Sequence, residues 1–338
     1  MWLVRPAQPQ DIEGIMKLAA EHCSQLSSTV PKTREGLEAR IELSSNSFSG
    51  ALGPDQCQRF LFVLVDSRDQ QVQGVAGIDG RAGNGQPFYN YRMDALIHSS
   101  HELGVSRRVD VLYPSHALTG RTLLGAFVIA PGLCDSDAFE LLSRARLVFI
   151  ASHRDWFSDD MAVEIQGIQT EHGEVPFWDS LGRHFFDMDF ETADRYSGML
   201  SKTFIAELMP PNPIYVTLLS GAAQQALGQA HPATRRSVSL LQQEGFHGGS
   251  YVDIFDGGPV LEVRTSNLKT LVTCQRKSLR ASDAEDGEQC LLACGQGADF
   301  RCTLAGISES LNEVIRAPLS VLHGLGCESG EDVMVAPL

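Results

Sequence analysis

The sequence predicts an α/β (α+β) protein in which strands and helices alternate, followed by a small β-rich C-terminal appendage. Short apolar runs alternate with amphipathic helical segments over most of the chain. Beyond residue 277 the chain becomes polar and acidic, and its remaining apolar runs are short and separated by glycines. Hydrophobic residues make up 43% of the 338 residues, which is typical of a folded globular protein.

The N-terminal part is predicted to begin with a strand, Trp2–Pro6, and a helix that Asp11 caps. A second helix is expected over Thr33–Leu43. The apolar runs Phe60–Asp66 and Gln73–Gly80, separated by a polar turn, indicate a hairpin.

The middle of the chain repeats the alternation of strand and helix. A helix that ends at Gly245 is expected before a hairpin whose tight turn is Asp256–Gly258. The other expected elements, in chain order, are strand Phe88–Ile97, strand Leu123–Ile129, helix Ser136–Ser152, strand Val163–Gln169, a short helix over Pro176–Phe186 and helix Thr234–Glu244.

The formal net charge of −15 argues against general binding to nucleic acid or to anionic membranes, since such a surface repels phosphates. From Ala281 onward there are ten carboxylates and two arginines, which we interpret as a solvated acidic face. The longest apolar stretches are too short to span a bilayer. With no targeting signal visible, we expect a cytoplasmic protein.

Eight cysteines are scattered through the chain, and free thiols are the expected state in a protein of this length and compartment. Cys290, Cys294 and Cys302 raise the possibility of a metal site. Their spacing differs from the usual pairs with matching histidines, so we predict no metal.

A helix ending in Gln242–Phe246 and followed by a strand, together with the opening strand and helix, resembles the two ends of a GNAT acyltransferase unit. The two ends lie too far apart for one ordinary unit of that fold. We therefore expect two GNAT-like units in tandem, residues 1–118 and 119–277, with one heavily extended unit as the alternative. Residues 278–338 are expected to form an acidic linker and a small β-rich domain.

Longer sequence motifs make the resemblance specific. They are Phe88–Arg92, Pro176–Trp178, Phe204–Pro210, Pro213–Tyr215, Gly228–Pro232 and Tyr251–Pro259. In order and in content these motifs are similar to those of the arginine N-succinyltransferase family, over roughly residues 1 to 275. The resemblance implies transfer of succinyl from succinyl-CoA to the α-amine of L-arginine or L-ornithine, with no permanently bound cofactor. It also implies a paralogous β subunit or self-association, with this chain of the α type.

His231 is the predicted catalytic residue. An imidazole that titrates near neutral pH can take a proton from the amine or give one to the departing thiolate. The family assigns the proton-donor role to the histidine of the Gly-Gln-x-His-Pro word, which corresponds to His231 here. The alternative is that His231 only caps the helix that follows it.

Binding of arginine requires anionic partners for the guanidinium. Glu207 and Asp253 lie in the matching words and are the predicted partners; Glu164 lies in a strand nearby, and Asp256 is assigned to a turn. Arg92 is predicted to bind a carboxylate, of succinyl or of the amino acid, with a structural salt bridge as the equal alternative.

For succinyl-CoA the resemblance implicates Phe127, in a strand whose backbone contacts the co-substrate. GNAT units follow this strand with a glycine-rich turn and a helix N-terminus that hold the pyrophosphate. Residues 131–140 depart from that pattern, and Asp135 and Asp137 add negative charge there.

Two readings therefore remain open: a catalytic succinyltransferase subunit, or a non-catalytic α subunit that supports a paralogous catalytic β subunit. A third is a transferase that uses another amine acceptor. The sequence contains no Gly-x-Ser-x-Gly, His-Glu-x-x-His or Walker pattern that would favour another enzyme class.

Overall fold

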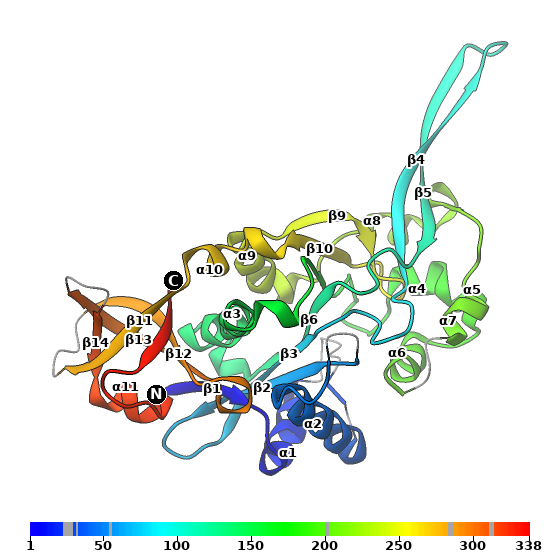
Figure 1. The fold of residues 1–338 in the computed structure, drawn as a ribbon. Helices are drawn as coiled ribbons and strands as arrows, with labels where there is room; N and C mark the ends of the chain where they lie inside the picture. Colours follow the sequence, from blue (N-terminus) through cyan, green and yellow to red (C-terminus); the bar gives the residue numbers. More distant parts are fainter. Residues whose placement is uncertain (23–29, 32, 54–55, 200–202, 283–286, 311–313) are drawn as a thin grey trace.

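The computed structural model describes residues 1–22, 30–31, 33–53, 56–199, 203–282, 287–310 and 314–338 (Figure 1). Within these residues every strand belongs to one continuous sheet. The strands are β1 (Trp2–Pro6), β2 (Arg59–Asp66), β3 (Val72–Asp79), β4 (Asn90–Ser100), β5 (Val105–Ser115), β6 (Thr122–Ile129), β7 (Asp160–Glu164), β8 (Ile214–Tyr215), β9 (His247–Val252), β10 (Pro259–Arg264), β11 (Gln275–Ser282), β12 (Glu288–Cys294), β13 (Arg301–Ser310), β14 (Val314–Pro318) and β15 (Asp332–Pro337).

Helices cover both faces of the sheet. They are α1 (Ile12–His22), α2 (Arg34–Phe48), α3 (Asp137–Ser152), α4 (Pro176–Ser180), α5 (Gly182–Phe186), α6 (Phe190–Met199), α7 (Thr203–Leu208), α8 (Gly221–Ala226), α9 (Arg235–Gln243), α10 (Lys269–Thr273) and α11 (Leu319–Leu325). None of these helices is both long enough and apolar enough to cross a membrane.

Strand β2 shows how the sheet separates two cores. Its side chains alternate in direction, as in any strand. Phe60, Phe62 and Leu64 pack into the core that contains α3 and α9, whereas Leu61, Val63 and Val65 pack into the core that contains α1 and α2. All six side chains are fully buried. A strand covered on both faces reads as a continuous apolar run, as the sequence has it here.

The order of strands in the body is β1-β2-β3-β6-β7-β10-β9-β4-β5-β8. Strands from either side of residue 118 are therefore interleaved, because β3 pairs with β6 and β4 pairs with β9. The division into tandem units at 118/119 stays a prediction, and this pairing joins the two segments closely. The α/β fold itself is confirmed.

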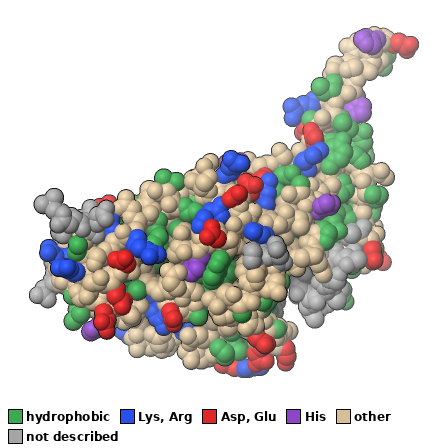
Figure 2. All heavy atoms as spheres, viewed as in Figure 1, with side chains coloured by type: hydrophobic (Ala, Val, Ile, Leu, Met, Phe, Trp, Pro, Cys, Tyr) green, Lys and Arg blue, Asp and Glu red, His purple; other side chains and the backbone are tan. Residues whose placement is uncertain are grey.

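The hairpin β4–β5 projects from the body as a long arm (Figure 1). The sequence predicted the first strand of this arm over Phe88–Ile97 but not its partner β5. Toward the tip, Ile97, Leu103 and Val105 are exposed, so the apolar–polar pattern that marks a half-buried strand is absent there. Figure 2 shows the same arm standing clear of a body on which acidic and basic side chains are interspersed.

The β-rich C-terminal appendage is confirmed as a closed ring of five strands. The pairing runs β12-β15-β11-β14-β13, and β13 pairs with β12 to close it. Closure leaves no free sheet edge, which suits so small a unit. Part of the expected linker differs: residues 278–282 lie in β11, where Leu279 is fully buried and neighbouring strands pair on both sides. Residues 283–286 of that linker lie outside the described residues.

Candidate active site

The parallel strands β6 and β7 separate partway along their length. Thr122, Leu123 and Leu124 pair with Met161, Ala162 and Val163. Beyond this point β6 continues beside β3 as far as Ile129, while the chain after β7 follows β10, with the Ile165 amide donating to the Pro259 carbonyl at 3.0 Å. Among the described residues β6 then has no strand neighbour on its β7 side. The two parallel strands therefore part here, and the opening between β6 and β7 means this unpaired stretch, residues 125–129 of β6.

An irregularity in β6 accompanies the opening. Ala126 has a φ of 50°, which is uncommon outside glycine, and the register with β3 shifts at this point. Beneath it the buried guanidinium of Arg146, from α3, donates to the Gly77 and Gly125 carbonyls at 3.4 Å each. Burial lowers the pKa of Arg146 to about 9, so this side chain remains protonated at neutral pH.

Phe127, the predicted succinyl-CoA residue, lies in this open part of β6. Its ring is half-buried, meets the Phe139 ring edge-on at 4.9 Å, and lies 5.3 Å from the Arg146 guanidinium carbon. Phe139 belongs to the first turn of α3. The open strand and the N-terminus of a 16-residue helix are therefore held together by packed side chains.

The loop between β6 and α3 carries a basic side chain that sequence reasoning missed. Arg236, from α9, donates to the carbonyls of Cys134 and Ser136, the latter at 2.9 Å, and lies over the Phe139 ring. Asp135 and Asp137, the two acids expected to oppose a pyrophosphate, are exposed. Arg236 comes from a segment a hundred residues later in the chain. The sequence feature that could have identified Arg236 is its position five residues after His231, in the same motif-rich region.

His231 lies beside the chain that leaves β7. Its backbone amide donates to the Gln166 carbonyl at 2.8 Å. Its Nδ1 accepts from the Ala233 amide at 3.2 Å, as the N-cap of a 3-10 turn, η5 (Pro232–Thr234). The capping role that was given as the alternative for His231 is thus present. It occupies Nδ1, so the other ring nitrogen, Nε2, is the one that can contact a substrate.

The environment of His231 favours its neutral form. Partial burial lowers the pKa of the imidazole below its ordinary value of 6.5. Because Nδ1 accepts the Ala233 N–H, a neutral ring carries its proton on Nε2. His231 can therefore present an N–H donor at neutral pH.

Three backbone segments are joined next to His231. Gly228, whose φ of 70° favours glycine, donates its N–H to the Gly257 carbonyl at 2.8 Å. The Asp256 carboxyl accepts from the amides of Gly167 and Gly258, both at 2.7 Å. Burial and the nearby Asp253 raise the pKa of Asp256 to about 8 against these two donors. Asp256 is thus a structural turn residue, as assigned from the sequence.

Glu164, at the end of β7, lies two residues before the carbonyl that His231 binds. Its Oε1 accepts from Nδ2 of Asn90 at 2.9 Å. Asn90 is fully buried, and its Oδ1 has no hydrogen-bond partner among the described residues. A half-buried carboxylate beside a buried amide oxygen is an environment suited to a cationic group.

Of the three predicted substrate residues, Asp253 belongs to the turn that contains Asp256, whereas Arg92 and Glu207 lie in other surroundings. Asp253 accepts the amides of Phe255 and Asp256 at 2.7 and 2.9 Å, and so shapes the turn after β9. Arg92 is exposed at the foot of the arm, where it pairs with Asp94 at 3.3 Å and lies over Tyr113. Glu207 is exposed on α7. Their roles in substrate binding stay predictions.

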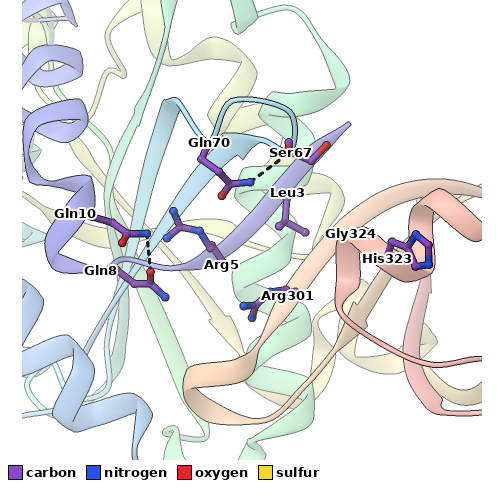
Figure 3. A pocket seen from close by; sticks show the side chains of 9 residues that line it. All are labelled: Leu3, Arg5, Gln8, Gln10, Ser67, Gln70, Arg301, His323 and Gly324. Carbon is purple, nitrogen blue, oxygen red and sulfur yellow. Dashed lines mark hydrogen bonds between the residues drawn. The ribbon is translucent and has the colours of Figure 1, made fainter.

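A cavity of about 350 Å³ lies elsewhere, between β1 and the C-terminal ring (Figure 3). Arg5, Arg301 and His323 line it together with several glutamines. Both terminal nitrogens of Arg5 donate to the Asp11 carboxylate at 2.8 Å. Asp11 is not the N-cap residue that we expected: it holds this buried ion pair and accepts the Gln8 amide at 2.8 Å in a capping box, with Gln8 as the N-cap of the 3-10 turn that leads into α1. None of the predicted site residues lines this cavity.

The comparisons with known proteins agree along the whole chain. Residues 2–270 match the family described as "Arginine N-succinyltransferase beta subunit", and residues 275–337 match the C-terminal domain of that family. The "Arginine N-succinyltransferase subunit alpha" of Pseudomonas aeruginosa is 37% identical over 334 residues, 98% of each chain. The "Arginine N-succinyltransferase" of Escherichia coli O139:H28 is 37% identical over 344 residues, covering 100% of this chain and 98% of its own.

A solved structure, of the arginine/ornithine succinyltransferase subunit AI from Pseudomonas aeruginosa, superposes with a TM-score of 0.90 at 34% identity. The match covers 100% of this chain and 98% of that one. Agreement of this kind extends over both the body and the C-terminal ring. The chain therefore belongs to the arginine N-succinyltransferase family of acyltransferases.

Proposed function

We propose that this chain transfers the succinyl group of succinyl-CoA to the α-amine of L-arginine, with L-ornithine as a second possible acceptor. The observation that carries the proposal is the placement of His231: a half-buried imidazole, fixed through Nδ1, beside the opening between β6 and β7. Family membership indicates the reaction class, and this geometry provides an N–H donor for the departing sulfur.

The reaction forms one bond and breaks another. The neutral α-amine attacks the thioester carbonyl, a C–N bond forms, and the C–S bond to CoA breaks. The departing sulfur takes up, through water, the proton that the amine nitrogen loses, while the Nε2–H of neutral His231 donates a hydrogen bond to that sulfur as its charge develops. The products are N-succinylarginine and the free thiol of CoA. Removing one positioned donor to developing charge costs about 10²- to 10³-fold in kcat.

We assign succinyl-CoA to the open side of β6 and the N-terminus of α3. Helix N-termini favour anions because their first N–H groups lack helical acceptors. The Ser136 hydroxyl donates to the Leu133 carbonyl instead of capping these groups. Arg236 adds a positive charge and holds the loop between β6 and α3 in place. These two effects replace what the usual glycine-rich turn would contribute to phosphate binding.

We assign the cationic end of the amino acid to Glu164, with Asn90 behind it. A guanidinium and an ammonium both satisfy a carboxylate, so this contact alone accepts arginine or ornithine. Arg92, Glu207 and Asp253 remain the sequence-based candidates for other contacts. Glu164 has the stronger support because it ends the strand from which the chain runs directly to the His231 contact.

The test is an assay of the purified chain by itself, following release of free thiol from succinyl-CoA. Thiol release that depends on arginine, with N-succinylarginine found by mass spectrometry, supports the proposal. Hydrolysis without an arginine requirement, or no turnover unless a paralogous subunit is added, would move the activity away from this chain. An association with such a β subunit, self-association and a cytoplasmic location are parts of the same proposal.

A further inference from the structure

Three side chains that the acyl transfer does not use meet in the C-terminal ring. Cys294 ends β12, Cys327 follows α11 after one glycine, and Glu331 immediately precedes β15. The two Sγ atoms and one carboxylate oxygen of Glu331 all lie within 4.8 Å of one another, and Cys294 Sγ is 4.0 Å from Oε2 of Glu331. These residues differ from the Cys290, Cys294 and Cys302 set considered from the sequence.

The other cysteines of that earlier set lie in different surroundings. Cys290 and Cys302 are buried within the strands β12 and β13, and both belong to hydrophobic cores. Cys294 is half-buried, Cys327 is buried and Glu331 is exposed, so the new cluster is open to solvent on its carboxylate side. An entering ion has a route to the cluster that it lacks to the other two thiols.

We propose that Cys294, Cys327 and Glu331 bind one thiophilic divalent cation of the zinc class, with water completing a tetrahedral site. Bonds of about 2.3 Å to sulfur and 2.0–2.2 Å to oxygen place donors roughly 3.5–3.8 Å apart around zinc. The three donors need to close by about an ångström or less from their present separations. Two thiolates select a soft cation over magnesium or calcium, and a carboxylate is an accepted third ligand.

The surroundings of Glu331 support this arrangement. Its Oε2 accepts the Glu328 amide at 3.2 Å, which orients the carboxylate in the way that second ligand shells commonly do.

A bound cation would cross-link two segments at one end of the closed ring. The cation joins the end of β12 to the segment between α11 and β15, so it links strands that already pair through Leu291–Ala336 and its neighbours. Binding to the folded form alone raises stability by mass action. A simple disulfide between the cysteines would join the same elements but would leave the Glu331 carboxylate without a role.

The test uses the full chain, stripped with a chelator and titrated with Co²⁺ as a spectroscopic substitute for zinc. We expect one equivalent to bind, with sulfur-to-cobalt charge-transfer absorption and a raised melting temperature after exchange for Zn²⁺. Cys294→Ser and Cys327→Ser should each abolish the absorption. Cys290→Ala, on the same strand, is the matched control and should keep it.

Glu331→Gln provides a variant at an exposed position that is expected to fold. It should keep cobalt–thiolate absorption but bind at least about tenfold more weakly. Absence of charge-transfer absorption at saturating cobalt overturns the proposal, as does absorption that survives in both serine variants. A Cys294–Cys327 disulfide found by mass spectrometry in protein purified without added oxidant overturns it as well.

Discussion

Two pairs of parallel strands occur among the described strands, and they behave in opposite ways. β11 and β14 stay paired through all five residues of β14, from Ser278–Val314 to Ser282–Pro318. β6 and β7 pair over three residues and then separate. The candidate transfer site lies at the pair that separates. The pair that stays closed belongs to the C-terminal ring, where Leu279, Ile315 and Ala317 are fully buried.

The physical difference lies in what stands next to each pair. Beside the unpaired part of β6, Ala126 has a positive φ, and the buried guanidinium of Arg146 binds carbonyls of β3 and β6. Beside β14 the described residues of the ring form a buried apolar cluster that includes Leu279, Ile315 and Ala317. An open pair can therefore offer backbone groups and a fixed imidazole to a substrate, whereas a closed pair contributes stability. Substitutions at the two places should separate turnover from stability.

The largest effect is expected from His231→Asn. Asparagine can still accept the Ala233 amide and cap the turn, but its shorter side chain leaves no N–H in the place of Nε2. We expect kcat to fall about 10²- to 10³-fold with little change in either KM, measured by thiol release as each substrate is varied in turn. His247→Ala, at an exposed histidine of β9, is the control and should be neutral. A kcat retained in the asparagine variant would leave His231 a capping residue only.

Leu279→Ala should show the opposite behaviour at the closed pair. Removing a fully buried leucine costs about 2–5 kcal/mol of unfolding free energy, measured by urea denaturation. At a temperature where the variant is folded, kcat per folded chain should remain unchanged. An equal loss in kcat would mean that the ring and the transfer site are coupled, and the contrast between the two strand pairs would fail.

Glu164→Gln should affect one substrate only. The glutamine can still accept from Asn90, but it loses the charge that a guanidinium requires, worth about 1.5–3 kcal/mol. We expect the KM for arginine to rise about 10- to 100-fold, with the KM for succinyl-CoA unchanged. Glu207→Gln is the matched comparison, since that carboxylate was the sequence-based candidate and is exposed on α7. The reverse outcome would restore Glu207 as the arginine partner.

Arg236→Met tests the loop between β6 and α3. Loss of two hydrogen bonds to the carbonyls of Cys134 and Ser136 should loosen the anion site, and removal of a positive charge should weaken it. We expect the KM for succinyl-CoA to rise about tenfold, or about 1.4 kcal/mol. Arg235→Met, at the exposed neighbour on α9, removes the same charge without those contacts and should have little effect.

How far the sequence predicted this structure depends on the range of the interactions. Local patterns sufficed for β1, for the β2–β3 hairpin and for α3, because periodicity and caps lie within each segment. The arm strand β5 was not predicted, because its exposed part near the tip lacks the alternation of apolar and polar residues that marks a strand. The expected strand Val163–Gln169 ends instead at Glu164, where the chain leaves β6, and only the tertiary arrangement decides that point.

The site divides along the same line. His231 was found from its word and its place before a helix, and Phe127 from its strand. Arg236 and the Asn90–Glu164 contact were not, since they join segments about 100 and 74 residues apart in the chain. The ion pair of Glu244, in the Gln-Gln-Glu-Gly-Phe motif, was not predicted either. Glu244 is buried, and its carboxylate lies 2.8 Å from the Arg144 guanidinium of α3. Contacts between distant segments leave no periodicity to read.

The smallest expected effect is a change in the shape of the pH profile. Burial lowers the pKa of His231, so its neutral form is favoured in the folded chain. Any stability linked to this group is complete above the ordinary pKa of 6.5 and is lost as the pH falls through the lower folded value. Protonation of Nδ1 would remove its bond to the Ala233 amide, so kcat should stay level above pH 6.5 and fall as the pH decreases through the lowered pKa of His231. This decline should be missing in His231→Asn. A decline centred above pH 6.5 would mean that a substrate carboxylate or phosphate raises the pKa of His231 in the complex, so that partial burial no longer sets it during turnover.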